Sequence, residues 1–386
     1  MTNGSLDRFA QHKLDSLARR NLRREMGVTE RRSGCEVDNR GTRLISFACN
    51  DYLGLSHHPD VIEASRAATA RYGAGAGASR LITGNHPLYA ELEDCLARLK
   101  GSEDAIVFGS GYLTNVGVIP VLAGASDLIL VDELSHSCIL AGAALSRAQV
   151  TTFKHNDVDD ARRVLAAERE RYRHCLLLTD GVFSMEGDLA PLATLATLAE
   201  GYDAWLMTDD AHGLGVVGAG RGSTFAHGTP VAVPLQMGTL SKAVGGYGGY
   251  LCASRPVAEL VRNRARSFVY STGLPPGTVA AAIAALKIIM SNVALVAKPL
   301  AHARRFTNLL ALPPAQSAIV AIVLGSAERA LQAGDALRRA GFLVAANRPP
   351  TVPNGTARLR FAFSAAHSDA EVAALAAAVS ANGIAA

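Results

Sequence analysis

The sequence has little charge and few aromatic residues, and it lacks any dense cluster of charges. Of its 386 residues, 19% are charged, 5% are aromatic and 49% are hydrophobic, which is typical of a globular protein rather than a disordered or fibrous one. The net charge is only +4, and the densest basic run, residues 19–24, is short and contains no aromatic residue. These absences argue against a nucleic-acid partner.

The sequence also lacks paired cysteines and long apolar runs. Its six cysteines are widely spaced and form no Cys-x-x-Cys pair, so we expect reduced thiols, no metal site and no disulfide framework. The polar residues around Asp7 and Arg8 do not resemble a secretion signal. The most apolar stretch, residues 279–297, contains Lys287 and Asn292, and we interpret it as a buried helix rather than a membrane span. The expected location is the cytoplasm.

Two common catalytic motifs are missing as well. No Gly-x-Ser-x-Gly elbow and no His-Glu-x-x-His motif is present, which argues against a serine hydrolase and a zinc peptidase. The stretch Gly73–Arg80 matches a loose Gly-x-Gly-x-x-Ala pattern, but it follows a predicted helix, whereas a dinucleotide fingerprint follows a strand. We interpret it as a flexible loop, which either lines a site or is a plain linker.

Strand patterns and helical patterns alternate from residue 86 onward at the spacing of βαβ units. Predicted strands cover residues 104–108, 128–131, 150–153, 174–180, 204–209, 231–237 and 250–253. Predicted helices cover residues 88–100, 139–145, 158–171 and 192–201, and another begins at the turn Gly109–Tyr112. This order predicts an α/β fold whose large, mostly parallel sheet carries helices on both faces.

The two ends of the chain have a different pattern. An amphipathic helix is predicted over residues 5–26, then a strand at 43–49 and a helix at 59–72. After residue 285 we predict a long helix, strands at 318–324, 343–346 and 357–363, and helices at 326–340 and 369–381. We therefore expect an N-terminal helix and arm (1–50), a large domain (51–285) and a smaller C-terminal α+β domain (286–386).

Lys242 stands at the centre of the chemistry that the sequence predicts. It follows a predicted buried strand in the turn Gly-Thr-Leu-Ser-Lys, and the glycine-rich stretch Gly245–Gly249 comes next. Burial lowers the pKa of a lysine and frees a nucleophilic amine, which typically forms a Schiff base with a carbonyl. A surface lysine in a glycine-rich loop is the competing interpretation.

Two strand ends carry groups that suit a phosphorylated aromatic ligand. At Gly109–Tyr112 a strand joins a helix start, where free N–H groups favour a phosphate, although many such turns bind nothing. Thr239 and Ser241 are expected to add hydroxyl donors to the same anion. Asp209, at the end of an apolar strand, suits a protonated ring nitrogen, and His212 suits a phenolate oxygen. A magnesium-binding aspartate pair and a structural Asp–His pair are the alternatives.

Three further candidates complete the set. His136 follows the strand that ends at Asp132 and suits stacking on an aromatic cofactor, although a lone histidine is more often structural. Ser184 follows another strand and is a candidate hydrogen-bond donor. In the last strand Arg358 and Arg360 alternate with apolar residues and share one face. Arg360 suits a carboxylate, whereas we interpret Arg358 as a solvated arginine on an edge strand.

The order of these features matches the pyridoxal 5′-phosphate (PLP) site of the aspartate aminotransferase fold (fold type I). The sequence resembles the α-oxoamine synthases over essentially its whole length. The motifs that carry the resemblance are residues 50–55, 180–188, 209–213 and 239–242. Within that family, Arg348–Arg360 and the His-Gly pair at 212–213 are similar to the branch that condenses pimeloyl thioesters in biotin biosynthesis.

The resemblance implies roles for individual residues. It makes Lys242 the Schiff-base lysine and Asp209 the partner of the pyridine nitrogen. His136 is implied to stack on the ring, and His212 and Ser184 to lie on its O3′ side. The implied phosphate ligands are Gly111, Tyr112 and Thr239, with Ser271 or Thr272 of a second subunit. The implied contacts for the amino-acid carboxylate are Asn50 and Arg360. The implied contacts for the acyl chain are Arg23 and Thr351, and His136 is also implied to contact the substrate.

The implied reaction is a decarboxylative condensation of L-alanine with pimeloyl-CoA or pimeloyl-ACP, catalysed by a homodimer whose active site lies at the subunit interface. Lys242 is implied to remove the Cα proton, and the ring to accept the electron pair. Residues 75–80 and 137–139 depart from some members of the family, and this leaves acyl specificity open. Glycine C-acetyltransferase activity, a plain aminotransferase and a catalytically silent binding protein are the alternatives.

Overall fold

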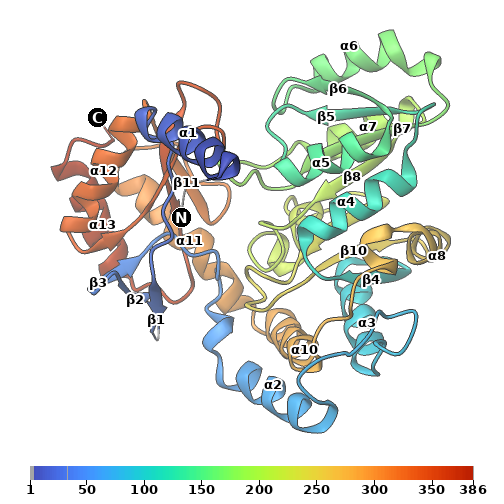
Figure 1. Cartoon of the computed structure of the whole chain (residues 1–386), viewed down its shortest axis with the longest axis horizontal. Helices are drawn as coiled ribbons and strands as arrows, with labels where there is room; N and C mark the ends of the chain where they lie inside the picture. The colour runs from blue at the N-terminus through green and yellow to red at the C-terminus, as the bar shows by residue number, and fades with distance from the viewer. Residues whose placement is uncertain (1–3, 33, 386) are drawn as a thin grey trace.

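The computed structural model describes residues 4–32 and 34–385, which form a larger and a smaller lobe (Figure 1). The expected segments 1–50 and 286–386 include residues 1–3, 33 and 386, which lie outside the described residues. The expected boundary at 285–286 falls inside the helix α10 (Pro276–Ser291). The three-domain division stays a proposal.

A seven-stranded sheet forms the centre of the larger lobe, in the order β4-β10-β9-β8-β7-β5-β6. Its strands are β4 (Asp104–Phe108), β5 (Leu128–Asp132), β6 (Gln149–Phe153), β7 (Cys175–Asp180), β8 (Trp205–Asp209), β9 (Leu235–Thr239) and β10 (Gly249–Ala253). Only β10 runs against its neighbours, β4 and β9. The prediction of a mostly parallel sheet is therefore confirmed.

Helices cover both faces of this sheet, as predicted. Alternate strand residues point to opposite faces, so Ile129 and Val131 pack in one core while Leu128 and Leu130 pack in another. The first core includes residues of α4 (Gly111–Leu122), α5 (Ser137–Ser146) and α8 (Arg255–Arg264). The opposite face is covered by α6 (Val158–Glu168) and α7 (Leu192–Gly201), and elsewhere by α2 (Pro59–Tyr72), α3 (Leu88–Lys100) and α10.

The smaller lobe joins the two ends of the chain. Its sheets are β11-β14-β13 and β1-β2-β3-β12, and its core includes Phe47, Phe306, Phe361 and Phe363. The strands are β1 (Thr29–Arg31), β2 (Glu36–Asn39), β3 (Thr42–Ser46), β11 (Ile319–Gly325), β12 (Phe342–Leu343), β13 (Ala345–Asn347) and β14 (Ala357–Ala362). The helices are α1 (Ser5–Arg19), α11 (Val293–Leu309), α12 (Ala327–Arg339) and α13 (Asp369–Ala381). The single strand predicted at 343–346 is wrong, because β12 pairs with β3 and β13 pairs with β14.

Several predicted elements differ from the observed bounds, and three differences are informative. The N-terminal helix ends at Arg19, because Asn21 adopts a left-handed conformation (φ 55°) and Leu22 N–H bonds back to the Leu17 carbonyl. The strand predicted at 231–237 begins at Leu235, directly after Pro234, and continues to Thr239. Residues 279–297 form two helices rather than one.

The break between α10 and α11 lies at Asn292, whose side chain caps α11 by accepting from Leu295 N–H (3.0 Å). The two helices differ in direction by 82°. Among the described residues no single helix is both long and apolar enough to cross a membrane, although this bent pair meets the same test of length and composition.

Candidate active site

The carboxyl ends of the parallel strands bring most of the predicted site residues to one edge of the large sheet. β5 leads to His136, β7 leads to Ser184, β8 ends at Asp209, and β9 leads to Lys242. The register pairs Asp180 with Asp209, so the ends of β7 and β8 are level. The sequence predicted this grouping because parallel strands end on the same side of a sheet.

The amine of Lys242 lies 2.7 Å from His212 Nε2. Burial lowers the pKa of Lys242 to about 8; the charge of Asp209 opposes this shift and that of Arg360 adds to it. The predicted depression of the lysine pKa is therefore present in the structure. At neutral pH a useful fraction of the amine is unprotonated and nucleophilic.

His212 links Lys242 to Tyr52, a residue to which the sequence analysis assigned no role. Burial, reinforced by the charge of Lys242, holds the pKa of His212 well below its ordinary value, so the imidazole is neutral. While Lys242 is an ammonium it can only donate to Nε2, so the imidazole proton lies on Nδ1, 2.6 Å from the Tyr52 hydroxyl oxygen. The Lys242–His212–Tyr52 chain thus fixes the tautomer.

Asp209 is buried and has only neutral hydrogen-bond partners among the described residues. Its Oδ1 accepts from Ala211 N–H (3.0 Å), and its Oδ2 accepts from Asn115 Nδ2 (2.8 Å). Asn115 also lies 3.0 Å from the Cys138 sulfur, which lies 2.8 Å from His136 Nδ1. Asn115 and Cys138 therefore connect Asp209 to His136, a link with no signal in the sequence.

Asp180 holds the backbone of the predicted stacking residue. Its Oδ2 accepts from His136 N–H (2.9 Å), and burial, with the nearby charge of Asp209, raises the pKa of Asp180 well above its ordinary value. Burial also lowers the pKa of His136, against the attraction of Asp209. A neutral ring at position 136 suits stacking on an aromatic cofactor better than a charged one.

The predicted phosphate turn begins α4. The Ser110 side chain caps the helix by accepting from Leu113 N–H (3.1 Å). The N–H groups of Gly111 and Tyr112 belong to the first turn, where no intrahelical acceptor exists, and they carry the positive end of the helix dipole. This arrangement is suited to an anion.

Thr239 packs against this turn. A Cβ on Gly111 would lie 3.3 Å from the Thr239 Cβ, so glycine is the residue that lets the two segments approach. The Thr239 hydroxyl lies 3.0 Å from that of Ser241 and 2.8 Å from the Gly248 carbonyl. The structure therefore brings all of the predicted intrasubunit phosphate ligands together.

Arg360 is buried and held on three sides by neutral acceptors. Its Nη1 donates to Asn50 Oδ1 (3.1 Å), its Nη2 donates to the Tyr52 hydroxyl (3.2 Å), and its Nε donates to the Ser184 carbonyl. The two residues expected at the amino-acid carboxylate, Asn50 and Arg360, are thus in direct contact.

The prediction for Arg358 is wrong. β14 lies between β11 and β13, so it is a central strand, and Arg358 is only 5% exposed. Its guanidinium forms an ion pair with Glu186 (2.7 Å) and donates to the Met185 carbonyl (3.1 Å). The predicted shared face is confirmed, because Arg358 and Arg360 both contact residues 184–186.

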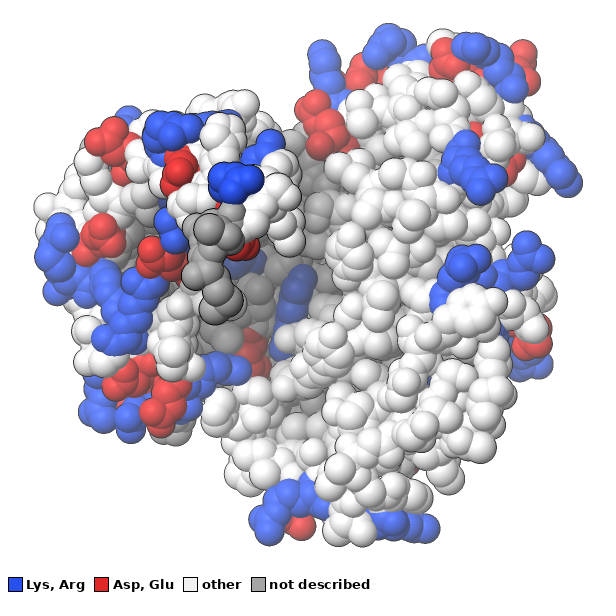
Figure 2. Space-filling view, in the orientation of Figure 1, with Lys and Arg blue, Asp and Glu red and all other residues white. Residues whose placement is uncertain are grey.

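A cavity of about 500 Å³ opens beside these residues, where the surface is hollowed between the two lobes (Figure 2). Both lobes contribute to its lining. The larger lobe contributes Glu133–Ser137, Leu140 and Ser184–Glu186, and the smaller lobe contributes Arg24 and Pro350–Pro353. Thr351 lies in this lining and accepts from Arg24 (2.7 Å). Arg23, the residue expected there, is not part of the lining, and its predicted role stays untested.

Ser271 and Thr272 do not line the 500 Å³ cavity. Within one chain they line a cavity of about 10 Å³ together with Gly109 and Arg80. The stretch 73–80 is a loop, as predicted, although Arg80 at its end is anchored by an ion pair with Glu93 and lies over the Tyr89 ring. This loop does not line the 500 Å³ cavity.

Comparison with known proteins agrees with this geometry. Residues 42–379 match the family described as aminotransferase class I and II. The chain belongs to this family. An 8-amino-7-oxononanoate synthase of Methylocella silvestris is 63% identical over 339 residues, which cover 88% of this chain and 97% of that protein. One of Beijerinckia indica is 58% identical, covering 95% of each.

Solved structures agree on the fold. A serine palmitoyltransferase from S. paucimobilis with a bound PLP–myriocin aldimine has a TM-score of 0.91 at 31% identity, covering 99% of this chain and 100% of that one. The 8-amino-7-oxononanoate synthase of Francisella tularensis has a TM-score of 0.74 at 25% identity, covering 88% and 99%. The expected PLP-dependent fold type I is confirmed, and the family is PLP-dependent.

The residues present fit this cofactor. Asp209 as a residue is 5% exposed. Its carboxylate has no cationic hydrogen-bond partner within residues 4–32 and 34–385, so it is available to a protonated ring nitrogen. The α4 N-terminus with Thr239 supplies donors for a phosphate, and Lys242 supplies an amine for the aldehyde.

Proposed function

We propose that this chain catalyses the PLP-dependent decarboxylative condensation of L-alanine with a pimeloyl thioester, giving 8-amino-7-oxononanoate, CO₂ and the free thiol carrier. The observation that carries the proposal is the Lys242–His212 pair beside Arg360, in a chain 57–63% identical to proteins named 8-amino-7-oxononanoate synthase. We place the activity in the cytoplasm, as the composition of the chain suggests.

In this proposal several residues hold the cofactor. Lys242 would bind its aldehyde carbon, Asp209 would keep a proton on the ring nitrogen, and His136 would stack on the ring. The N–H groups of Gly111 and Tyr112 and the Thr239 hydroxyl would bind the phosphate. His212 and Ser184 would lie near the phenolic oxygen. When bound, PLP stores the electron pair that is left at Cα after the proton is removed.

Residues of the protein bind the amino acid and transfer its proton. Arg360 and Asn50 bind the carboxylate of L-alanine and orient its Cα–H bond toward Lys242. The Lys242 amine removes that proton and later returns one, which its lowered pKa of about 8 allows near neutral pH. His212 remains neutral and so does not add a competing positive charge next to the amine.

The 500 Å³ cavity is the proposed acyl site. Apolar side chains at Leu140, Met185 and Val352 suit the methylene chain, whereas Arg24 and Thr351 place a cation and a hydroxyl at its rim. Arg23 directly precedes Arg24 in the sequence and stays a proposed contact of the acyl chain. Such a lining favours an acyl chain with a polar end over a plain alkyl chain.

We also propose a homodimer with its active site at the interface. Large apolar side chains are exposed in the phosphate turn (Tyr112, 52%), directly before Ser271 (Tyr270, 76%) and just after the loop 73–80 (Ile82, 75%). Figure 2 shows a broad, mostly uncharged surface on the larger lobe. Burying this surface against a second copy would place that copy's Ser271 or Thr272 beside the phosphate.

The test is a substrate matrix with the purified protein loaded with PLP. L-Alanine, glycine and L-serine are each combined with pimeloyl-CoA, pimeloyl-ACP, acetyl-CoA and palmitoyl-CoA, and CO₂ and free thiol are measured. We expect turnover with alanine and a pimeloyl thioester. Preference for serine with palmitoyl-CoA, suggested by the TM-score of 0.91, or for glycine with acetyl-CoA would overturn the proposed substrates.

Conversion of PLP to its amine form by alanine, without thiol release, would show an aminotransferase instead. A matched control is the Lys242→Ala variant, which removes the amine and leaves the cavity lining intact.

A further inference from the structure

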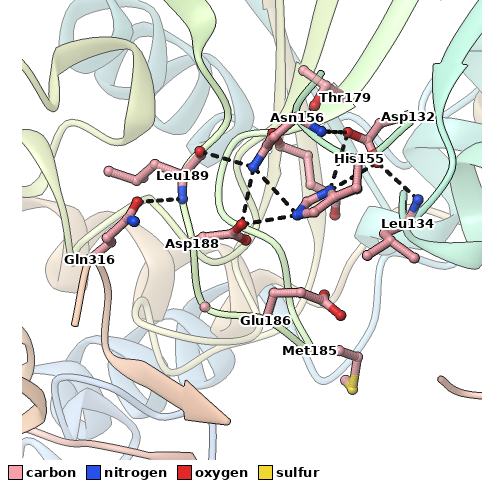
Figure 3. Close-up of polar contacts among 12 residues, drawn as sticks. Asp132, Leu134, His155, Asn156, Thr179, Met185, Glu186, Asp188, Leu189 and Gln316 are labelled. Carbon is pink, nitrogen blue, oxygen red and sulfur yellow. Dashed lines mark hydrogen bonds and ion pairs between the residues drawn. The ribbon is translucent and has the colours of Figure 1, made fainter. Parts of the chain in front are cut away.

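His155 lies between two carboxylates at the edge of the site (Figure 3). It follows β6, and its Nδ1 lies 3.1 Å from Asp132 Oδ1 while its Nε2 lies 2.9 Å from Asp188 Oδ2. A carboxylate accepts hydrogen bonds and cannot donate them, so both ring nitrogens must donate. The geometry therefore requires the imidazolium form.

The electrostatics agree with this geometry. Burial alone would lower the pKa of His155, but the hydrogen bonds and charges of Asp132 and Asp188 outweigh it and raise the pKa to about 10. Within the described part of the chain, Glu133 is the one other charged residue that contacts His155; its carboxylate accepts from the His155 backbone N–H (3.2 Å). The Phe183 ring lies nearly perpendicular to the imidazole ring (84°), with ring centroids 4.3 Å apart.

The two carboxylates belong to different walls of the 500 Å³ cavity. Asp132 ends β5 and accepts from Leu134 N–H (2.9 Å), which fixes the segment that leads to His136. Asp188 lies in the segment 181–190, which also carries Ser184, and its carbonyl accepts from Phe183 N–H (3.0 Å). Residues of both segments, Glu133–Ser137 and Ser184–Glu186, line the cavity. His155 thus bridges the His136 wall and the Ser184 wall.

Asn156 reinforces the bridge. Its backbone N–H donates to Asp132 (2.8 Å), while its side chain donates to Asp188 (3.1 Å) and to the Leu189 carbonyl (3.3 Å). Beyond it, Leu189 N–H donates to Gln316 Oε1 (3.1 Å), so the Ser184 wall is also tied to the smaller lobe (Figure 3).

We propose that His155 is a positioning residue, which sets the spacing between the His136 wall and the Ser184 wall and thereby orients the bound cofactor and the acyl chain. Without its two donors and its positive charge, Asp132 and Asp188 keep only the neutral donors of Asn156 and Leu134. Their mutual repulsion is then no longer offset by a cation between them, and it moves the walls apart. The inference rests on the proposed function for the acyl chain, but not for the cofactor.

The test compares PLP-loaded His155→Gln, which can serve only one carboxylate at a time, with Asp188→Asn, which preserves shape. His174→Gln is the matched control, because His174 lies before β7 at the opposite end of the strand and stacks on Trp205. The readouts are the visible circular dichroism of lysine-bound PLP, the dissociation constant of PLP, and separate KM values for the amino acid and the thioester.

For His155→Gln we expect a weaker circular dichroism band, a PLP dissociation constant raised about tenfold, and kcat lowered about tenfold to hundredfold, since a misplacement of about 1 Å has effects of this size. The KM for the thioester should rise more than that for alanine, because both walls line the acyl cavity, whereas Arg360 contacts the Ser184 wall through one hydrogen bond and is also held by Asn50 and Tyr52. Asp188→Asn should change each readout in the same direction, and His174→Gln should change none.

Unchanged circular dichroism and PLP affinity in the folded His155→Gln variant would overturn the proposal. If that variant does not fold, the same result in Asp188→Asn would overturn it. The two cofactor readouts need no thioester, so they test His155 even if the protein condenses substrates other than those proposed.

Discussion

The lowered pKa of Lys242 leads to a quantitative prediction about how the protein attaches its cofactor. With a pKa of about 8, ~10% of the amine is neutral at pH 7, whereas an ordinary lysine with a pKa of ~10.4 would have only ~0.04% neutral. Since only the neutral amine attacks the aldehyde, burial increases the reactive fraction by about two hundredfold.

Two neighbours should shift this pKa in opposite directions. Asp209→Asn removes a negative charge that favours the ammonium, so the pKa of Lys242 should fall below 8. Arg360→Met removes a positive charge that disfavours it, so the pKa should rise above 8. Both side chains are replaced by ones of similar size, which limits the change in burial.

The assay is the rate of PLP attachment to apoprotein at saturating PLP, followed by its visible absorbance from pH 6 to 11. We expect a midpoint at about 8 for the unmodified chain, a lower midpoint for Asp209→Asn and a higher one for Arg360→Met. A midpoint above 10 in the unmodified chain, or shifts of the same sign in the two variants, would refute the reasoning.

Lys242→Ala should abolish turnover, and near-normal condensation activity would contradict its assigned role. The pKa of His155 is raised from 6.5 to about 10, so its contribution to the free energy of unfolding is complete below pH 6.5 and is lost as the pH rises through 10. Free energies of unfolding from denaturant titrations of the unmodified chain and of His155→Gln should therefore converge over that range. Lys100→Met should lower the free energy of unfolding by about 3–5 kcal/mol, because it leaves Asp210 charged and fully buried. Cys138→Ala removes the partner of His136 Nδ1 and should shift the visible circular dichroism of bound PLP, whereas Cys138→Ser should restore it.

Much of the larger lobe could be predicted from the sequence because its strands are buried on both faces and its helices have clear ends. The predicted bounds of α2, α3, β4 and α7 are the observed ones, and in the smaller lobe so are those of α13. The site could be located for the same reason, since every parallel strand that ends in polar residues delivers them to one edge of the sheet.

The elements that were missed are short strands with no sustained alternation of polar and apolar residues. β2 reads Glu-Val-Asp-Asn and shows no sustained alternation, and β12 contributes two residues that pair with β3 some 300 positions earlier. Such strands form because the rest of the lobe presents an edge to pair with, which a local pattern does not reveal.

The same reason explains the missed site residues. Tyr52 contacts His212 from 160 positions away, and Asn115 contacts Asp209 from 94. Tyr52 lies in a turn and Asn115 within α4, and the local pattern around each gives no sign of the contact. Their roles depend on which side chain the folded chain places opposite them.

For Arg358 and Arg360 the sequence pattern predicted which face they share but not whether that face is buried. Their alternation predicted one shared face, but whether that face is solvated depends on β11 and β13, which pair with β14 on either side. The two arginines then differ in charge balance. Arg358 is neutralised by Glu186 and secures the Ser184 segment, whereas the hydrogen-bond partners of Arg360 among the described residues are all neutral. Arg360 therefore keeps its full charge, which lowers the pKa of Lys242 and remains available to the carboxylate of an amino acid.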